Sequence, residues 1–177
     1  MAPSRPVHET ARLALHRFTG ADAAFLVELL NEPSFLRYIG DKGVRTEADA
    51  CRYLEAGPLA SYARHGFGLL RVELKEGGEP VGMCGLLKRD WLPDPDIGFA
   101  LLPRFWRRGY ALEVASAVLA HARDGLGLKR VVAITSPDNA ASIGLLEKLG
   151  FRFERMARPS DREPEVRLFG LDLTKEA

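Results

Sequence analysis

The sequence predicts one α/β domain built on a mixed sheet with helices on both faces. Two observations lead to this prediction. The middle of the chain has the two-residue hydrophobic period of half-buried strands, with a glycine-rich turn between two of them. The second half alternates strand-like and helix-like segments, an order that brings parallel strands into a sheet. The 177 residues fit one domain, and we expect a loose lead-in over residues 1–10 and the domain over residues 11–177.

Seven segments carry the hydrophobic pattern of strands. They are residues 13–18, 70–74, 81–87, 97–102, 131–135, 151–156 and 165–173. Leu70, Val72 and Leu74 alternate with charged residues, which is the pattern of a strand with one buried face. The turn Glu76–Glu79 contains two adjacent glycines, and glycine takes positive φ without strain. We therefore expect the strands on either side of this turn to form a hairpin.

Four segments have the apolar spacing of helices. They follow Thr19–Asp22, begin at Thr46, run from Ala111 to Gly125, and run from a cap at Pro137–Asp138 to Gly150. Pro33 is expected to end the first of them, because the residue before a proline disfavours helical dihedrals. Thr46 is followed three residues later by Asp49, the spacing of a capped helix start. Gly150 stands at the C′ position, where a helix end favours glycine.

Charge and cysteine content argue against several classes of protein. The 25 basic and 24 acidic residues give a net charge of +1, without the basic excess typical of nucleic-acid binding. Cys51 and Cys84 have neither zinc-binding nor disulfide spacing, so we expect no metal and a reducing, cytoplasmic setting. The N-terminal residues lack the apolar core of a signal peptide, and no apolar run reaches membrane-spanning length. We therefore expect neither a nucleic-acid nor a membrane partner.

The most informative stretch joins the strand at residues 97–102 to the helix that follows it. Its sequence, Trp106–Ala111, is Trp-Arg-Arg-Gly-Tyr-Ala. The first turn of a helix has unpaired N–H groups and the positive end of the helix dipole, which together suit a phosphate. Gly109 allows close approach of the backbone to a ligand, and Arg107 and Arg108 add positive charge. The stretch has neither the dinucleotide fingerprint nor the Walker A pattern, so it predicts a phosphate-binding loop of another kind.

This loop resembles the coenzyme A loop of the GNAT acetyltransferase superfamily. It is most similar to the branch that acetylates ribosomal-protein N-termini and small amines. The superfamily pattern has Gln or Arg first, Gly fourth and Gly or Ala sixth; here it falls on Trp106–Ala111, with Trp in the first place. A second superfamily block begins with Asn and a small residue and ends in Lys-x-Gly-Phe, and it matches Asn139–Phe151. Two blocks in the same order, with a helix between them, are a more specific signal than either alone.

The resemblance implies the GNAT fold and acetyl-CoA as the acetyl donor. The fold would be a mixed, mostly antiparallel sheet of about seven strands, with helices on both faces and a splayed parallel pair at residues 97–102 and 131–135. The pyrophosphate would bind the loop amides, and the pantetheine arm would lie between the splayed strands. The implied coenzyme-binding residues are Leu101, Leu102, Arg107, Arg108, Gly109, Tyr110, Ala111, Asn139 and Ser142.

The implied reaction transfers acetyl to a primary amine, of a small molecule or a protein N-terminus, by direct attack in a ternary complex. Asp96, at the start of a strand, is the candidate base or acceptor contact, and a turn acid is the alternative. Many relatives have a tyrosine where this chain has Leu146, which leaves Ser142 as the candidate proton donor to the thiolate. Ser142 also suits close helix packing. Glu113 is expected to be an acid that favours a helix start.

The first helices are implied to shape the acceptor pocket. Arg37, Tyr38 and Trp91 are candidate acceptor-side residues, and His65 is a loop histidine that could face the same cleft. Three alternatives stay open: a longer acyl donor, a hydroxyl acceptor, and a regulator that binds coenzyme A without catalysis. The terminal strand at residues 165–173 could also pair in a homodimer.

Overall fold

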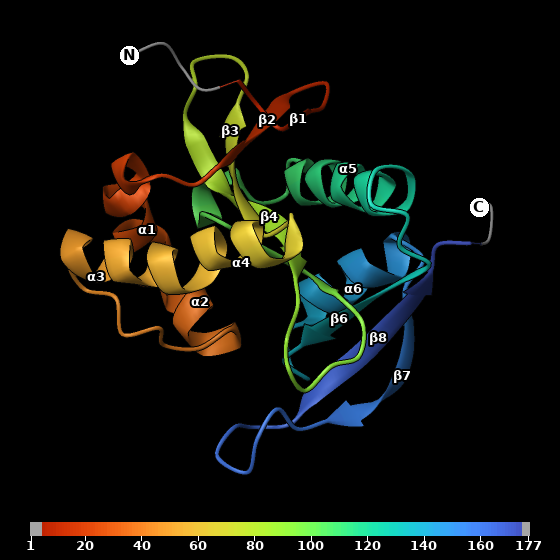
Figure 1. Cartoon of the computed structure of the whole chain (residues 1–177). Helices are drawn as coiled ribbons and strands as arrows, with labels where there is room; N and C mark the ends of the chain where they lie inside the picture. Colours follow the sequence, from red (N-terminus) through yellow and green to blue (C-terminus); the bar gives the residue numbers. More distant parts are fainter. Residues whose placement is uncertain (1–4, 175–177) are drawn as a thin grey trace.

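A computed structural model describes residues 5–174, and a single eight-stranded sheet runs through it (Figure 1). The strands are β1 (His8–Glu9), β2 (Leu13–Arg17), β3 (Leu69–Leu74), β4 (Pro80–Leu87), β5 (Asp96–Leu101), β6 (Arg130–Thr135), β7 (Arg152–Ala157) and β8 (Val166–Asp172). Their order across the sheet is β1-β2-β3-β4-β5-β6-β8-β7. Neighbours are antiparallel except β5 and β6, which are parallel. The expected mixed, mostly antiparallel sheet is confirmed, with β1 as a strand beyond the expected seven.

Helices lie on both sides of the sheet. They are the short turns η1 (Gly20–Asp22), η2 (Glu55–Leu59) and η3 (Pro103–Phe105) and the helices α1 (Ala23–Leu30), α2 (Pro33–Tyr38), α3 (Glu47–Leu54), α4 (Ala60–His65), α5 (Tyr110–Asp124) and α6 (Ala140–Lys148). Helices α1–α4 gather on one side of β2–β4, and α5 lies on the other (Figure 1). Pro33 ends the expected first helix and also begins α2, because proline at the first helical position lacks only an N–H that the helix does not use. No helix within residues 5–174 is long and apolar enough to span a membrane.

The helix starts show one confirmed cap and one correction. Thr46 Oγ1 accepts from the N–H of Asp49 at 3.1 Å, and Asp49 Oδ2 accepts from the N–H of Thr46 at 3.0 Å, which is a capping box. The expected cap of α6 at Pro137–Asp138 is wrong. Asn139 is the cap, and its Oδ1 accepts from the N–H of Ser142 at 3.2 Å. The neighbouring aspartate instead accepts hydrogen bonds from other side chains of the loop and of α2.

Glycines with positive φ follow β3 and α6, at the positions that the sequence predicts. Gly77 and Gly78, with φ of +86° and +68°, make the turn between β3 and β4. Gly150, with φ of +93°, follows α6. The N–H of Gly150 donates to Glu147 O, and the N–H of Phe151 donates to Leu146 O, both at 3.0 Å. This bond pair satisfies carbonyls that the end of a helix leaves free.

One continuous hydrophobic core holds the loop-bearing elements in place. The buried face of α5 consists of Val114, Ala115, Val118, Leu119 and Ala122. Cys84 of β4 and Leu146 of α6 belong to the same core. Because both ends of the segment from β5 to α5 are anchored in this core, the loop between them is fixed at the sheet edge.

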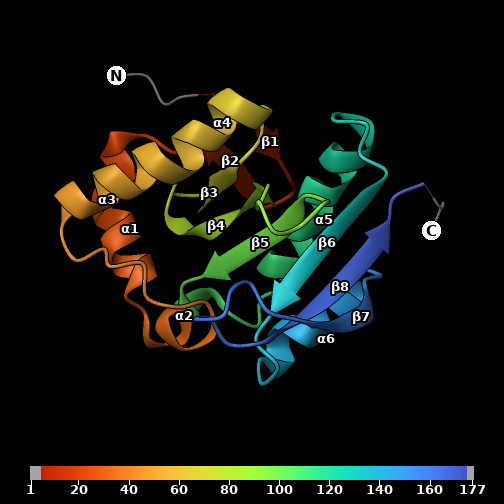
Figure 2. The ribbon, with the colours of Figure 1, turned by 60° about the horizontal axis from the view of Figure 1, so that its bottom comes forward.

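The parallel pair β5–β6 is joined only where it begins. Within the described residues, the single paired position is Asp96 opposite Val132, beside a bond from the N–H of Val132 to Pro95 O at 3.0 Å. On its other edge β5 pairs with β4 along its whole length. Figure 2 shows β5 beside β6 and running toward α2. The expected splayed pair is therefore present, and most of β5 lacks a strand partner on the β6 side.

Candidate functional site

The turn between β5 and α5 presents unpaired backbone N–H groups. Gly109 caps α5 with φ of +79°. Arg107 has φ of +59°, a left-handed conformation that is uncommon outside glycine. Within the described residues, no hydrogen bond takes up the N–H groups of residues 107–112. Free amides at the positive end of a helix, beside two exposed arginines, are features that suit the binding of an anion.

The β5 backbone adds donors to the same region. The N–H of Leu102 donates to Val81 O on β4 at 2.9 Å. In an antiparallel ladder every second residue bonds the same neighbour, so the N–H groups of Phe99 and Leu101 point away from β4. They face the side where β5 and β6 separate. An extended ligand could bond there as a further strand would.

Hydrogen bonds from Thr10 and Arg12, near the N-terminus, hold the loop before α5 in place. Arg12 Nε donates to Glu113 Oε2 at 2.7 Å, and Arg12 Nη1 donates to the carbonyl of Arg108 at 2.9 Å. Thr10 Oγ1 donates to Glu113 Oε1 at 2.6 Å. Burial alone would raise the pKa of Glu113, but the hydrogen bonds from Thr10 and Arg12 outweigh it and lower that pKa. Glu113 therefore does more than favour a helix start: it holds the loop.

The implied coenzyme-binding residues fall into two groups. Leu101, Leu102 and residues 107–111 lie together at the end of β5 and the start of α5. Asn139 and Ser142 lie at the start of α6, after β6. Since β5 and β6 are parallel, both groups follow the carboxyl ends of the splayed strands, where ligands bind in open α/β sheets.

The two candidate catalytic residues have different surroundings. Asp96 is 1% exposed, and Arg89 Nε lies 3.1 Å from both of its carboxylate oxygens. Burial raises the pKa of Asp96, and the Arg89 charge opposes that rise. Ser142 is half-buried on α6, one turn before Leu146, which is 1% exposed in the core.

A cavity of about 400 Å³ lies beside β5, on the side of α2 and α4. It is lined by Phe35, Ile39, Lys42, Tyr53, Ala56, Gly57, Pro58, Ala60, Ser61, Arg64, His65, Leu69, Met83, Leu86, Leu87, Lys88, Arg89, Gly98 and Phe99. This volume is in the usual range for a small-molecule site. Phe99 links the cavity to the donors on β5, so the two halves of the site meet at this residue. Asp96 and Ser142 do not line it.

Of the expected acceptor-side residues, the structure places one in this cavity. His65, the last residue of α4, lines it. Arg37 is exposed and forms an ion pair with Asp138, with 3.3 Å between Nη2 and Oδ2. Tyr38 lies beneath that guanidinium, and Trp91 packs against a small second cluster around β6 and β8.

Sequence reasoning missed the basic residues of the cavity. Lys42 follows α2, Arg64 is on α4, and Arg89 follows β4. They are far apart in the sequence and share no motif, so only the packing of the helices on the sheet brings them to one cavity. Tyr53 also lines the cavity while packing against the hydrophobic core.

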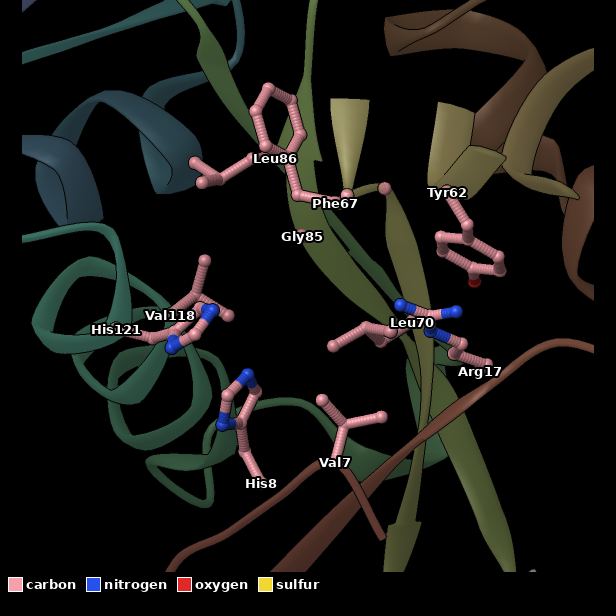
Figure 3. Close-up of a pocket in the computed structure, with 12 residues that line it drawn as sticks. Val7, His8, Arg17, Tyr62, Phe67, Leu70, Gly85, Leu86, Val118 and His121 are labelled. Carbon is pink, nitrogen blue, oxygen red and sulfur yellow. The ribbon is translucent and has the colours of Figure 1, made fainter. Parts of the chain in front are cut away.

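A second cavity, of about 40 Å³, lies between β1, α4 and α5 (Figure 3). The rings of His8 and His121 approach to 4.2 Å on one side of it, and Tyr62 and Arg17 lie on the other. The Tyr62 hydroxyl accepts from the N–H of Phe18 at 3.2 Å and donates to the carbonyl of a β3 residue. A space of this size holds about one water molecule, so it does not suit an acceptor substrate.

Comparisons with known proteins agree with this geometry. The Acetyltransferase (GNAT) domain family matches residues 12–152. The uncharacterised N-acetyltransferase YoaA of Bacillus subtilis (strain 168) is 30% identical over 155 residues, which are 86% of each chain. The acetyltransferase of Agrobacterium tumefaciens str. C58 has a TM-score of 0.79 at 26% identity, over 97% of this chain and 96% of that one.

A more distant structure shows the same fold. RimL, a ribosomal L7/L12 α-N-protein acetyltransferase in complex with coenzyme A, has a TM-score of 0.79 at 17% identity, over 95% of this chain and 97% of that one. The family match over residues 12–152 and the relative that is 30% identical over 86% of each chain lead to one conclusion: the chain is an acetyltransferase of the GNAT family.

Proposed function

We propose that this acetyltransferase uses acetyl-CoA as its donor and a primary amine as its acceptor, on a small molecule or a protein N-terminus. One observation carries the proposal. The free N–H groups of residues 107–112 stand at the start of α5, directly after the β5 edge that lacks a strand partner. The loop would bind the pyrophosphate, and the edge would bind the pantetheine arm. The coenzyme A in the distant RimL structure supports the choice of donor.

The proposed reaction needs no enzyme nucleophile. The amine nitrogen attacks the thioester carbonyl carbon, a C–N bond forms, and the C–S bond breaks. The N–H of Phe99, which faces the gap beside β5, is placed to stabilise negative charge on the carbonyl oxygen. The amine loses a proton to a base and the departing thiolate gains one, so the protons balance.

We assign the proton transfers to groups on both sides of the gap. Ser142 is the proposed donor to the thiolate, because it carries a hydroxyl in the first turn of α6, one turn before Leu146, where many relatives have a tyrosine. Asp96 acts on the acceptor side. Its carboxylate is buried against Arg89, so it would serve by orienting Arg89 or by accepting a proton once Arg89 moves.

The test is thiol release from acetyl-CoA in the presence of a panel of primary amines. The proposal predicts acceptor-dependent thiol release together with an acetylated amine detected by mass spectrometry. A protein that binds acetyl-CoA but releases no thiol with any amine, even at high pH, would instead be a coenzyme A-binding regulator. Faster release with alcohols or with longer acyl donors would point to the two other acyltransferase alternatives.

A further inference from the structure

The cavity beside β5 is lined by positive charge. Its basic residues are Lys42, Arg64, His65, Lys88 and Arg89, and none of its lining residues is acidic. An acceptor site with this lining favours a ligand that carries an anion. The apolar walls, formed by residues such as Phe35, Tyr53 and Met83, leave room for a hydrocarbon part as well.

Among these basic residues, Arg89 and Lys42 are available to a ligand and Lys88 is not. Lys88 Nζ donates to the carbonyls of Arg89 and Leu92, which turns its ammonium to the backbone. Arg89 Nε donates to the carboxylate of Asp96, while the terminal nitrogens of Arg89 have no hydrogen-bond partner among residues 5–174. Lys42 forms no ion pair within the same residues.

Arg89 and Lys42 belong to one electrostatic unit. Asp96, which is 1% exposed, forms an ion pair with Nε of Arg89. This contact fixes the orientation of the guanidinium and of its terminal nitrogens. Desolvation by burial and then the Arg89 charge lower the pKa of Lys42, and the Glu163 charge opposes this shift. Arg89 and Lys42 line the same cavity, and two neighbouring positive charges form a site that an anionic group would stabilise.

We propose that the acceptor is a small primary amine that also carries a carboxylate or phosphate group, and that Arg89 and Lys42 bind this anion. The amine end then points to β5, where Phe99 lines the same cavity. This inference rests on the proposed amine acetylation. It excludes polyamines, because a second positive charge would lie among the lining cations at a cost that no carboxylate in the lining offsets.

The experiment compares matched acceptors in the thiol-release assay. The pairs are leucine with isoamylamine, which lacks the carboxylate, and O-phosphoethanolamine with ethanolamine; spermidine and a peptide with an acidic N-terminal segment complete the panel. We expect kcat/KM to be about tenfold or more higher for the anionic member of at least one pair. Preference for carboxylate or phosphate identifies the anion.

The variant Lys42→Ala tests the site itself. We expect KM for the preferred anionic amine to rise about tenfold relative to KM for its partner without the anion, and Lys42→Arg to restore the wild-type KM. Lys129→Ala, which removes an exposed lysine outside the cavity, is the matched control. Thermal unfolding and acetyl-CoA affinity confirm that each variant is folded.

Failure of the inference differs from failure of the proposed function. Equal or better turnover of the amines without an anionic group, of spermidine, or of the peptide alone would overturn the proposal of a small anionic acceptor. The inference would also be overturned if the protein binds acetyl-CoA but acetylates no anionic amine. A folded protein that does not bind acetyl-CoA would overturn the proposed function itself.

Discussion

Arg12 and Glu113 are joined by an ion pair that links the turn between β1 and β2 to helix α5, which begins after Gly109. Arg12 Nε lies 2.7 Å from Glu113 Oε2, and the backbone N–H of Arg12 donates to Glu113 Oε1 at 2.9 Å. Arg12 also donates to the carbonyl of Arg108. The Glu113 carboxylate therefore acts on the loop through Arg12. Removal of this carboxylate should weaken the binding of acetyl-CoA.

Glu113→Gln should weaken both the fold and donor binding. The amide keeps the size of the side chain but loses the charge that accepts three hydrogen bonds, so we expect the free energy of unfolding to fall by about 1–2 kcal/mol. Acetyl-CoA affinity should fall several-fold because Arg12 no longer holds the loop. Urea unfolding and titration calorimetry measure the two effects. Glu28→Gln is the control, since Glu28 pairs with Arg104 in an exposed ion pair that should contribute less than about 1 kcal/mol.

The same pair predicts a pH dependence of stability. The pKa of Glu113 is lower in the folded protein than in the unfolded chain. Its contribution is therefore fully present above the unfolded pKa and is lost as the pH falls through the folded pKa. The difference in unfolding free energy between wild type and Glu113→Gln should be constant near neutral pH and shrink in acid. A difference that grows on acidification would contradict the assignment.

Arg107→Gly separates charge from backbone strain. Arg107 has φ of +59°, which glycine adopts freely, so the substitution should leave the free energy of unfolding nearly unchanged. Acetyl-CoA affinity should fall about threefold to tenfold through loss of a contact with phosphate. Arg107→Val should in addition destabilise the protein, because a β-branched residue is disfavoured at positive φ. Unchanged affinity in the glycine variant would mean that Arg107 is a solvated surface charge.

Asp96→Asn distinguishes two roles for the buried carboxylate. If Asp96 orients Arg89, KM for the acceptor should rise while kcat stays within a few-fold of wild type. If Asp96 is the base, kcat should fall about 100-fold or more, and the limb of the pH–rate profile that reports the base should disappear. The 1% exposure of Asp96 and the contact of both its carboxylate oxygens with Arg89 Nε favour the first result.

The sequence predicts those parts of the molecule that depend on neighbours along the chain. The loop at Gly109, the capping box at Thr46 and the glycine turn after β3 are local, because each is set by a few consecutive residues. The cap of α6 was missed by one residue, since Asp138 and Asn139 are both good caps and the loop contacts decide between them.

The acceptor side could not be predicted in the same way. Lys42, Arg64 and Arg89 come from three different elements, and only long-range packing of α2–α4 on the sheet brings them to one cavity. The burial of Asp96 likewise depends on Arg89, which follows another strand. Residues whose roles arise from contacts between distant segments leave no periodic or motif signal in the sequence.

The measurement that tests the central claim most directly is calorimetric titration of acetyl-CoA into wild type, Gly109→Asp and Gly77→Asp. Both glycines have positive φ, +79° and +86°, so both substitutions impose similar backbone strain. Only Gly109 lies in the loop, where an aspartate would also repel phosphate. We predict micromolar binding by wild type and Gly77→Asp, and loss of binding by folded Gly109→Asp. Equal binding by all three proteins, or none by folded wild type, would contradict the assignment of this loop to acetyl-CoA.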